Sequence, residues 1–261
     1  MGTSEIILLF CAALLGGAVN SVAGGGGFIA FPALLFTGMP SINANATNTV
    51  ALWPGTLAST GAYRKALNGG LLKRILPLIV ITFLGSILGS ALLLKTRVST
   101  FDKLVPWLLL GATVLFSFGG KITAWINRHH AEGGPSLGRV IGVTVLQLCV
   151  AIYIGYFGAG VGIVMLALLS MMGMENIHSM NGLKTLLATC GNAMAVIMFI
   201  FARAVFWPQA LLMVVGAALG GYAGAWFAQK MDPKSVRYVA ITIGYSMTTY
   251  FFWRVYLHGH V

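Results

Sequence analysis

The stretch "NSVAGGGGFIAFP" (residues 20–32) places four consecutive glycines, residues 24–27, in the middle of an apolar segment. Glycine in a helix interior costs about 0.5–1 kcal/mol relative to alanine, because its backbone has the most freedom to lose. A run of four glycines is therefore expected to end a helix. Because apolar residues continue on both sides, the sequence predicts that this helix ends inside a membrane.

The composition of the whole chain excludes a soluble globular domain. Of its 261 residues, 58% are hydrophobic and only 8% are charged, and the mean hydropathy is +0.89. Soluble domains have roughly 25% charged residues, so we predict an all-α polytopic membrane protein. The first apolar segment, residues 6–22, has no basic region before it and no evident cleavage site, and we expect it to stay as a membrane helix.

The net charge of +11 is explained mainly by topology. Lysines and arginines gather in short loops, for example at residues 64–65, 73–74 and 128, where they can contact anionic lipid headgroups. We therefore expect a lipid bilayer and no nucleic acid as partner. An anionic substrate is a second interpretation that is compatible with this charge.

The sequence does not show the residue spacings that are typical of enzyme active sites. Cys11, Cys149 and Cys190 lie in apolar segments without CxxC spacing, which disfavours disulfide, metal and redox roles. The glycine run is followed by Phe28 and lacks the Lys-Ser/Thr ending of a phosphate-binding loop. We expect no enzyme, no catalytic residue, no cofactor and no metal site.

Eight apolar segments have the length of about 20 residues that a membrane-spanning helix needs. They are residues 4–22, 44–63, 75–94, 104–126, 138–157, 183–202, 208–229 and 235–256. Two further apolar pieces, 27–38 and 162–173, are too short, because twelve residues of helix extend only about 18 Å. Each follows a glycine-rich break, "AGGGG" (23–27) or "GYFGAGVG" (155–162).

The two breaks belong to a predicted internal repeat with an offset of 135 residues. The glycine pairs at this offset are Gly25 with Gly160, Gly27 with Gly162, Gly38 with Gly173, Gly85 with Gly220 and Gly89 with Gly224. We predict two homologous repeats, 1–126 and 138–261, joined by a polar linker at 127–137. Each would hold about four spanning helices and one short broken or re-entrant helix. Gly85 and Gly89, like Gly220 and Gly224, have the spacing of close helix packing.

The distribution of basic residues favours inverted repeats. If each half has five crossings and the N-terminus lies outside, ten of the assigned Lys and Arg residues lie inside and five lie outside. If the chain has eight crossings and the N-terminus lies inside, nine lie inside and six lie outside. Because cytoplasmic loops carry the excess of Lys and Arg, we expect the inverted arrangement.

Broken helices at matching positions of two membrane repeats point to a transporter's binding site. A helix that begins at membrane depth presents free backbone N–H groups and partial positive charge, which favour an anion. Polar residues follow each break on the next spanning segment. The predicted substrate-binding residues are Gly26, Gly27, Asn45, Thr47, Asn48, Gly162, Asn181, Lys184 and Asn192. Hydrogen bonds between neighbouring helices are the alternative role for each asparagine.

Lys184 is the most informative charged residue of the predicted site, because placing a lysine in an apolar membrane helix costs free energy unless its charge is paired or solvated. We predict that it supplies positive charge to an anion; the alternative is a lysine that reaches back to the membrane surface. Glu175 and His178, just before it, are candidates for proton coupling or are loop residues at the surface.

The combined motifs resemble the TauE/SafE family, the sulfite exporter-like anion permeases. "GGGGFIAFPALLFTGMP" followed by "ANATNTVAL" is similar to the first signature of that family, and "GAGVGIVMLALLSMMGMENIHSMNGLKTLLA" to its repeat. "LGGYAGAWFAQKMDPKSVR" is similar to the closing segments. The chain departs from the family at residues 181–184, where Asn-Gly-Leu-Lys replaces an Ala-x-Gly-Thr-Ser-like segment, so the second half of the site and its substrate can differ.

The resemblance implies movement of sulfite, organosulfonates or related small anions across the bacterial inner membrane, often outward. We therefore expect a multi-pass secondary transporter, an exporter of a small anion that works by alternating access between the repeats. A passive anion channel is the alternative. A third hypothesis is a membrane-embedded enzyme, with Glu175 and His178 as its candidate catalytic pair, or an assembly scaffold. The expected partners are the small anion and the bilayer, and a homodimer is left open.

Overall fold

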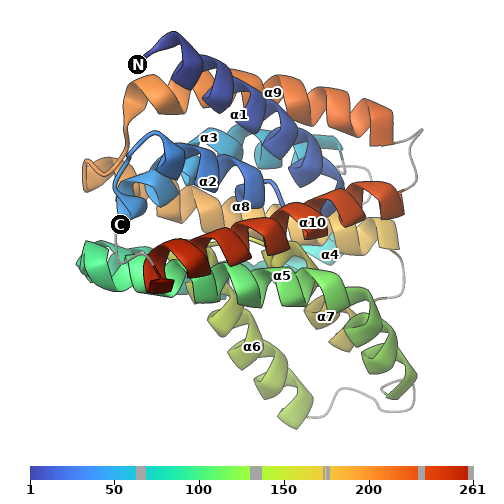
Figure 1. The fold of residues 1–261 in the computed structure, drawn as a ribbon. Helices are drawn as coiled ribbons and strands as arrows, with labels where there is room; N and C mark the ends of the chain where they lie inside the picture. Colours follow the sequence, from blue (N-terminus) through green and yellow to red (C-terminus); the bar gives the residue numbers. More distant parts are fainter. Residues whose placement is uncertain (63–68, 130–136, 173, 175–176, 229–232, 258–261) are drawn as a thin grey trace.

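The computed structural model describes residues 1–62, 69–129, 137–172, 174, 177–228 and 233–257 (Figure 1). Within these ranges the chain forms ten α-helices and no strand. They are α1 (Thr3–Ala23), α2 (Gly27–Phe36), α3 (Ser41–Ala62), α4 (Gly69–Lys95), α5 (Val98–His129), α6 (Leu137–Tyr156), α7 (Val161–Met171), α8 (Ile177–Phe201), α9 (Trp207–Ala228) and α10 (Pro233–Phe252), with a π-helical turn, η2 (Trp253–Leu257), after α10. The predicted all-α class is thereby confirmed.

The glycine run ends a helix where the sequence predicts it. Helix α1 stops at Ala23 because Gly24 has the left-handed φ of +80°, a conformation that only glycine adopts without strain. Helix α2 then begins at Gly27. In the second break, Gly158 (φ +74°) and Gly160 (φ +72°) turn the chain, and α7 begins at Val161, one residue before the predicted start at Gly162.

Two helix pairs pack unusually closely, α1 with α9 and α4 with α6. A Cβ on Gly220 of α9 would collide with the backbone of Leu14 on α1. A Cβ on Gly89 of α4 would likewise collide with the backbone of Ile152 on α6. Glycine at these positions lets two backbones touch, which is how small residues join helices in membranes. The packing role predicted for Gly85, Gly89 and Gly220 is confirmed.

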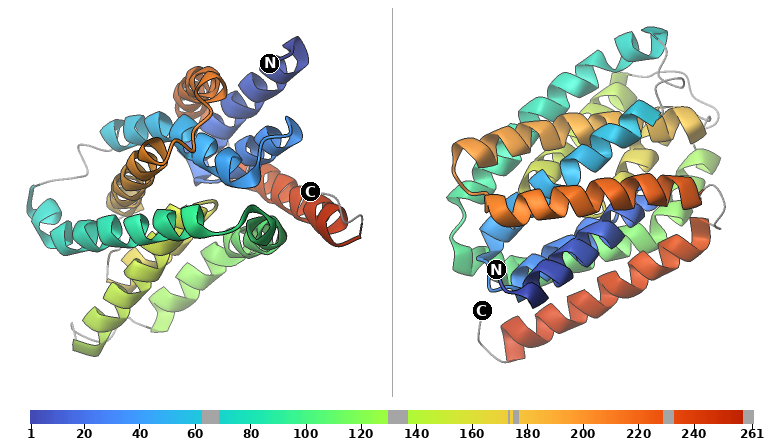
Figure 2. Two further views of the ribbon diagram at one scale, coloured as in Figure 1. Left: turned by 90° about the vertical axis from the view of Figure 1, so that its left-hand side faces the viewer. Right: turned by 90° about the horizontal axis from the view of Figure 1, so that it is seen from above.

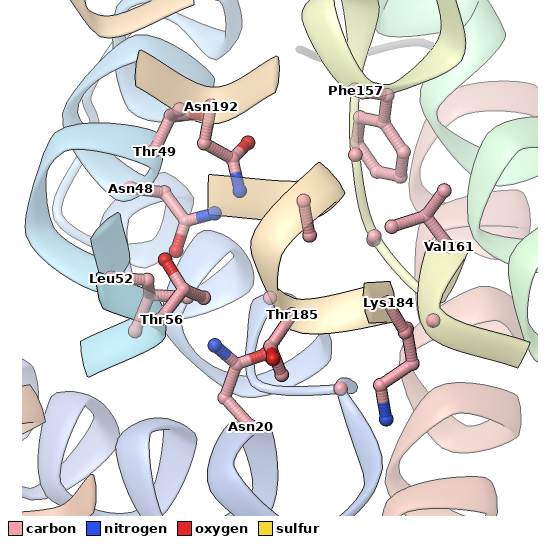
Figure 3. A pocket seen from close by; sticks show the side chains of 16 residues that line it. Asn20, Asn48, Thr49, Leu52, Thr56, Phe157, Val161, Lys184, Thr185 and Asn192 are labelled. Atoms are coloured by element: carbon pink, nitrogen blue, oxygen red, sulfur yellow. The ribbon is translucent and has the colours of Figure 1, made fainter. Parts of the chain in front are cut away.

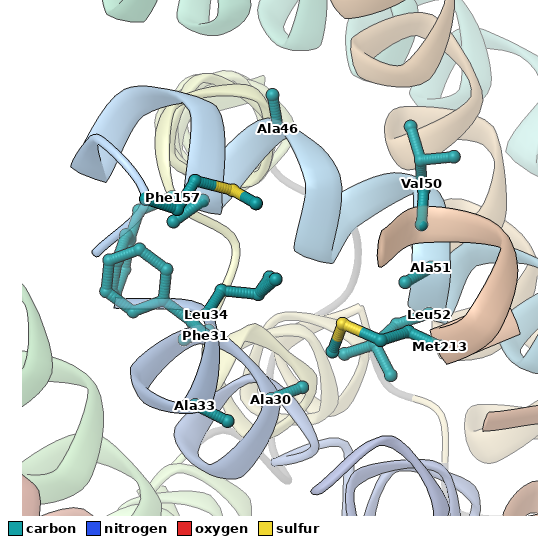
Figure 4. Packing of buried hydrophobic residues seen from close by; sticks show 14 of the residues in the cluster. Ala30, Phe31, Ala33, Leu34, Ala46, Val50, Ala51, Leu52, Phe157 and Met213 are labelled. Carbon is teal, nitrogen blue, oxygen red and sulfur yellow. The ribbon is translucent and has the colours of Figure 1, made fainter. Parts of the chain in front are cut away.

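The short helices lie inside the bundle of long ones. Helix α2 contacts α1, α3 and α10, and α7 contacts α5, α6 and α8 (Figure 2). Around α2 lies a core of buried apolar side chains that includes Phe31, Leu34, Phe157 and Met213 (Figure 4). The rings of Phe31 and Phe157 meet edge to face, with centroids 5.4 Å apart. Both breaks are therefore held by packing as well as by glycine.

The outer faces of the long helices are apolar. On α4, Leu84, Leu88 and Leu92 are all more than half exposed and share one helix face because they are four residues apart. By length and apolar composition, four of the described helices can cross a membrane, over Thr3–Asn20, Ile75–Lys95, Val98–Leu115 and Ser179–Phe201. Shorter apolar stretches lie in α2, α6 and α9. An apolar exterior of this kind fits a multi-pass membrane protein.

Candidate anion-binding site

The N-terminal ends of α2 and α7 meet near the middle of the molecule. A Cβ placed on Gly24 would lie 3.6 Å from the Cα of Gly162, and one on Gly27 would lie 3.5 Å from the Cβ of Ala159. The two glycine-rich breaks, far apart in the sequence, therefore lie against each other. The partial positive charges of both helix starts point into the same region.

A cavity of about 80 Å³ lies between these helix starts and is lined by sixteen residues (Figure 3). They come from the end of α1, the start of α2, the middle of α3, the break between α6 and α7 with the start of α7, and α8. Phe157, Leu52, Val161 and Ala188 form its apolar part. Its side-chain polar groups belong to Asn20, Asn48, Thr49, Thr56, Lys184, Thr185 and Asn192.

The hydroxyl groups at the cavity are already used within their own helices. The Thr49 hydroxyl donates to the carbonyl of Asn45 at 2.8 Å, and the Thr185 hydroxyl donates to the carbonyl of Asn181 at 3.0 Å. Their protons are thus committed to backbone groups, as threonine commonly does inside a helix. The remaining side-chain donors at the cavity are the amides of asparagines and the Lys184 ammonium group.

Two asparagines turn their amides toward the cavity, Asn48 from α3 and Asn192 from α8 (Figure 3). Asn48 is 6% exposed, and its Oδ1 is buried without a hydrogen-bond partner in the described part of the chain. Its Nδ2 lies 3.6 Å from the position that a Cβ on Gly27 would occupy. The Oδ1 atom is an acceptor and would need a donor, whereas the Nδ2 group beside the start of α2 is the part of this amide that can donate to an anion.

Lys184 brings a positive charge to the cavity from the first third of α8. Its side chain is 9% exposed, and its Nζ donates to Asn181 Oδ1 at 3.0 Å. Among the described residues no carboxylate lies within ion-pair distance of its Nζ. A buried charge with one neutral partner is unfavourable, and an anion in the cavity would compensate it.

Five of the nine residues expected to bind substrate line the cavity: Gly27, Asn48, Gly162, Lys184 and Asn192. Asn181 lies one turn of α8 from Lys184 and accepts its hydrogen bond. Gly26 is buried against α1, where a Cβ would collide with the backbone of Gly16. These two residues lie behind the cavity wall.

Asn45 and Thr47 have partners outside the cavity. Asn45 Nδ2 donates to the carbonyl of Tyr156, the last residue of α6, at 3.1 Å. Thr47 Oγ1 accepts the backbone N–H of Phe206, just before α9, at 3.1 Å. Both side chains therefore satisfy backbone groups at the ends of helices in the other half of the chain. These hydrogen bonds fix the position of α3 relative to α6 and α9.

The two candidates for proton coupling fall where little is described. Glu175 lies outside the described residues. His178 belongs to α8, but its side chain is outside the described part.

Asn20, Thr49, Thr56 and Thr185 line the cavity although the sequence analysis did not assign them to it. Of these four residues, Asn20 is the one that the sequence could have assigned to the site. It is a polar residue inside the apolar α1, and its carbonyl accepts the Gly24 N–H at 3.1 Å. An asparagine one helical turn before a break at membrane depth is the signal that could have placed it.

Comparison with known proteins agrees with this architecture. The model of the family described as sulfite exporter TauE/SafE matches residues 9–251. A probable membrane transporter protein of Haemophilus influenzae is 27% identical over 95% of this chain and 94% of its own length. The probable membrane transporter protein ORF9 of a Sinorhizobium species is 28% identical over 93% of this chain and 90% of its own length.

A third relative is the probable membrane transporter protein YfcA of Escherichia coli, 27% identical over 92% of this chain and 87% of its own length. No solved structure matches the chain significantly. The family match covers nearly all ten helices, including both breaks and the cavity between them. The chain therefore belongs to the sulfite exporter TauE/SafE family.

Proposed function

We propose that the chain is a secondary transporter of a small anion, sulfite or a short organosulfonate, and that the cavity between α2 and α7 is its substrate site. The observation that carries the proposal is the meeting of two helix N-termini beside a buried lysine that has no carboxylate partner among the described residues. Helix starts at membrane depth favour anionic groups in transporters.

The donors around the cavity fit an oxyanion. An oxyanion accepts hydrogen bonds, and the Asn48 and Asn192 amides, the Lys184 ammonium group and the starts of α2 and α7 all offer donors or positive potential. In this assignment Gly27 and Gly162 let the backbone approach the ion. Asn45, Thr47, Asn181 and Gly26 act as positioning residues.

The size of the cavity favours a small substrate. A volume of about 80 Å³ corresponds to roughly three water molecules, which is the size range of a small oxyanion with few or no waters. The description of the family as sulfite exporters supports sulfite as the first substrate to test and outward movement as the direction. The bacterial relatives support the inner membrane as the location.

Alternating access would come from two inverted repeats, α1–α5 and α6–α10. In these repeats α1 is equivalent to α6, α3 to α8 and α4 to α9. The packing supports this equivalence, because the contact of α1 with α9 is matched by that of α6 with α4, and the contact of α3 with α9 by that of α8 with α4. The contacts of α3 with α8 and of α5 with α10 join equivalent helices. In Figure 1 the chain runs rightward along α1, α3 and α5 and leftward along α6, α8 and α10. Equivalent helices with opposite directions are typical of inverted repeats.

The test is counterflow in proteoliposomes loaded with unlabelled sulfite, sulfoacetate, taurine, sulfate or a carboxylate. A carrier should take up labelled sulfite against its own gradient when the lumen holds a transported anion, because exchange needs a site that alternates. Empty liposomes are the control. Uptake that follows voltage without saturation and without stimulation from the opposite side would indicate a passive anion channel. No uptake of any anion would contradict the proposal.

A further inference from the structure

A second cavity, of about 340 Å³, lies at the other end of α2. It is formed where α2 leads into α3, at the start of α5, and at the end of α10 with η2. Gly38 and Pro40 on its rim are exposed, so the cavity is open to the outside. The ten-residue helix α2 therefore joins two cavities, with its N-terminus at the first and its C-terminus at the second.

Asp102 of α5 contributes the carboxylate of this second cavity and is 6% exposed. Arg254 of η2 also lines the cavity and attracts the carboxylate, but the described residues include no ion pair within 4.0 Å. Among the described residues, Arg254 is the one other ionisable residue that lines the cavity, and Arg97 and Lys103, close to Asp102 in the chain, are exposed. A buried carboxylate without a close counter-ion is expensive.

The Ser41 hydroxyl provides a second oxygen. Its side chain is 4% exposed, lines the cavity, and its Oγ has no hydrogen-bond partner among the described residues. The hydroxyl lies near the Asp102 carboxylate, although the geometry is outside that of a full hydrogen bond. The unpartnered Ser41 Oγ and the Asp102 carboxylate thus share one cavity, where a bound cation would give the serine oxygen a partner and balance the carboxylate charge.

The end of α2 adds negative potential to the same place. The helix closes with the N–H groups of Thr37 and Gly38 bonded to the carbonyls of Leu34 and Leu35, and its carbonyl end carries partial negative charge. Such helix ends coordinate coupling ions in transporters. Among the described residues no three His, Cys, Asp or Glu side chains cluster, so the donor set suits a monovalent cation or a proton rather than a divalent metal.

We propose that the cavity at the C-terminal end of α2 is a monovalent-cation site, with Asp102 and Ser41 as its oxygen ligands, that couples anion transport to a Na⁺ or proton gradient. This inference rests on the proposed function. Helix α2, about 15 Å long, is the physical link, because its start faces the anion and its end faces the cation. Arg254 competes with the cation for Asp102, which keeps the site weak enough to release the ion.

The test compares gradient-driven accumulation with counterflow for Asp102→Asn. Proteoliposomes receive labelled sulfite under a ten-fold inward Na⁺ gradient at equal pH, or under a one-unit pH gradient without Na⁺, with the voltage clamped. With one-for-one coupling the wild-type protein can accumulate sulfite about ten-fold under the gradient that it uses. For Asp102→Asn we expect accumulation to fall to about one-fold while sulfite counterflow stays within about two-fold of wild type.

Glu5→Gln is the matched control, because it makes the same chemical change at the other described carboxylate, at the start of α1, and should leave accumulation unchanged. Ten-fold accumulation by Asp102→Asn would overturn the cation site. So would loss of both accumulation and counterflow in a variant that elutes like wild type, because Asp102 would then serve the anion path itself. Wild-type counterflow that ignores both gradients overturns only this inference, whereas absence of wild-type counterflow overturns the proposed function.

Discussion

On α3, polar side chains near the start of the helix bind backbone groups of the other half of the chain, whereas on α8 polar side chains of the second turn and beyond face a cavity. Asn43 donates to the carbonyl of Ala204 at 2.8 Å, and Asn45 and Thr47 also bind backbone groups. Lys184 and Asn192 of α8 line the cavity. Similar polar clusters after two similar breaks therefore have different partners.

This difference separates two uses of polar residues in membrane helices. The N–H and C=O groups at helix ends need partners because no water reaches them in the hydrocarbon core, and α3 provides those partners. Among the described residues, Lys184 bonds to Asn181 of its own helix and forms no ion pair, so its charge remains available to a ligand. Substitutions at Asn43, Asn45 and Thr47 of α3 should mainly change stability. Substitutions of the residues that line the cavity, Lys184 and Asn192 of α8 and Asn48 of α3, should mainly change transport.

The largest expected effect is on transport by Lys184→Gln. Removing a buried charge that pairs with a ligand costs about 2–5 kcal/mol, so the apparent affinity for sulfite should fall at least about 30-fold. The measurement is the concentration dependence of sulfite counterflow. Lys95→Gln, at the exposed end of α4, is the matched control and should behave like wild type. Wild-type affinity for sulfite in Lys184→Gln would show that Lys184 does not bind the substrate.

Much of the fold was predictable because it depends on local chemistry. The ten helices follow from apolar length and from the two breaks, where glycine adopts a left-handed backbone at Gly24 and Gly160. The close packing at Gly89 and Gly220 also followed from spacing alone. What lies outside the described residues, including Glu175, stays a prediction.

The roles of single polar residues were not predictable to the same degree. Whether Asn45 or Asn48 faces a cavity depends on which helix end lies opposite, and that is set by the packing of α3 against the other half of the chain. Asp102 was overlooked for the same reason. In the sequence it is one charge near the start of a helix, and only the fold places it with Ser41 at the end of α2.

The next largest effect concerns stability and compares two asparagines of α3. Asn45→Ala leaves the partly buried carbonyl of Tyr156 without its donor, which should cost about 1–3 kcal/mol. The Oδ1 atoms of Asn45 and Asn48 both lack a partner in the described part, but Asn45 also donates to a carbonyl of another helix, so Asn48→Ala should cost less. Thermal unfolding of the purified proteins in detergent measures both. Counterflow should show the reverse order, with Asn48→Ala weakened and folded Asn45→Ala close to wild type. Equal stability of the two variants would break the distinction drawn on α3.

The smallest effect is expected for Thr47→Val, which keeps the side-chain volume but removes the acceptor of the Phe206 N–H. Because this N–H lies just before α9, the hydroxyl acts as a cap supplied by another helix, and its loss should cost about 1 kcal/mol. Thr49→Val is the matched control. The Thr49 hydroxyl donates to a carbonyl of its own helix, so its removal should cost less than about 0.5 kcal/mol. A larger loss of thermal stability in Thr49→Val than in Thr47→Val would show that α3 is held by its own hydrogen bonds and not by those it makes to the other half of the chain.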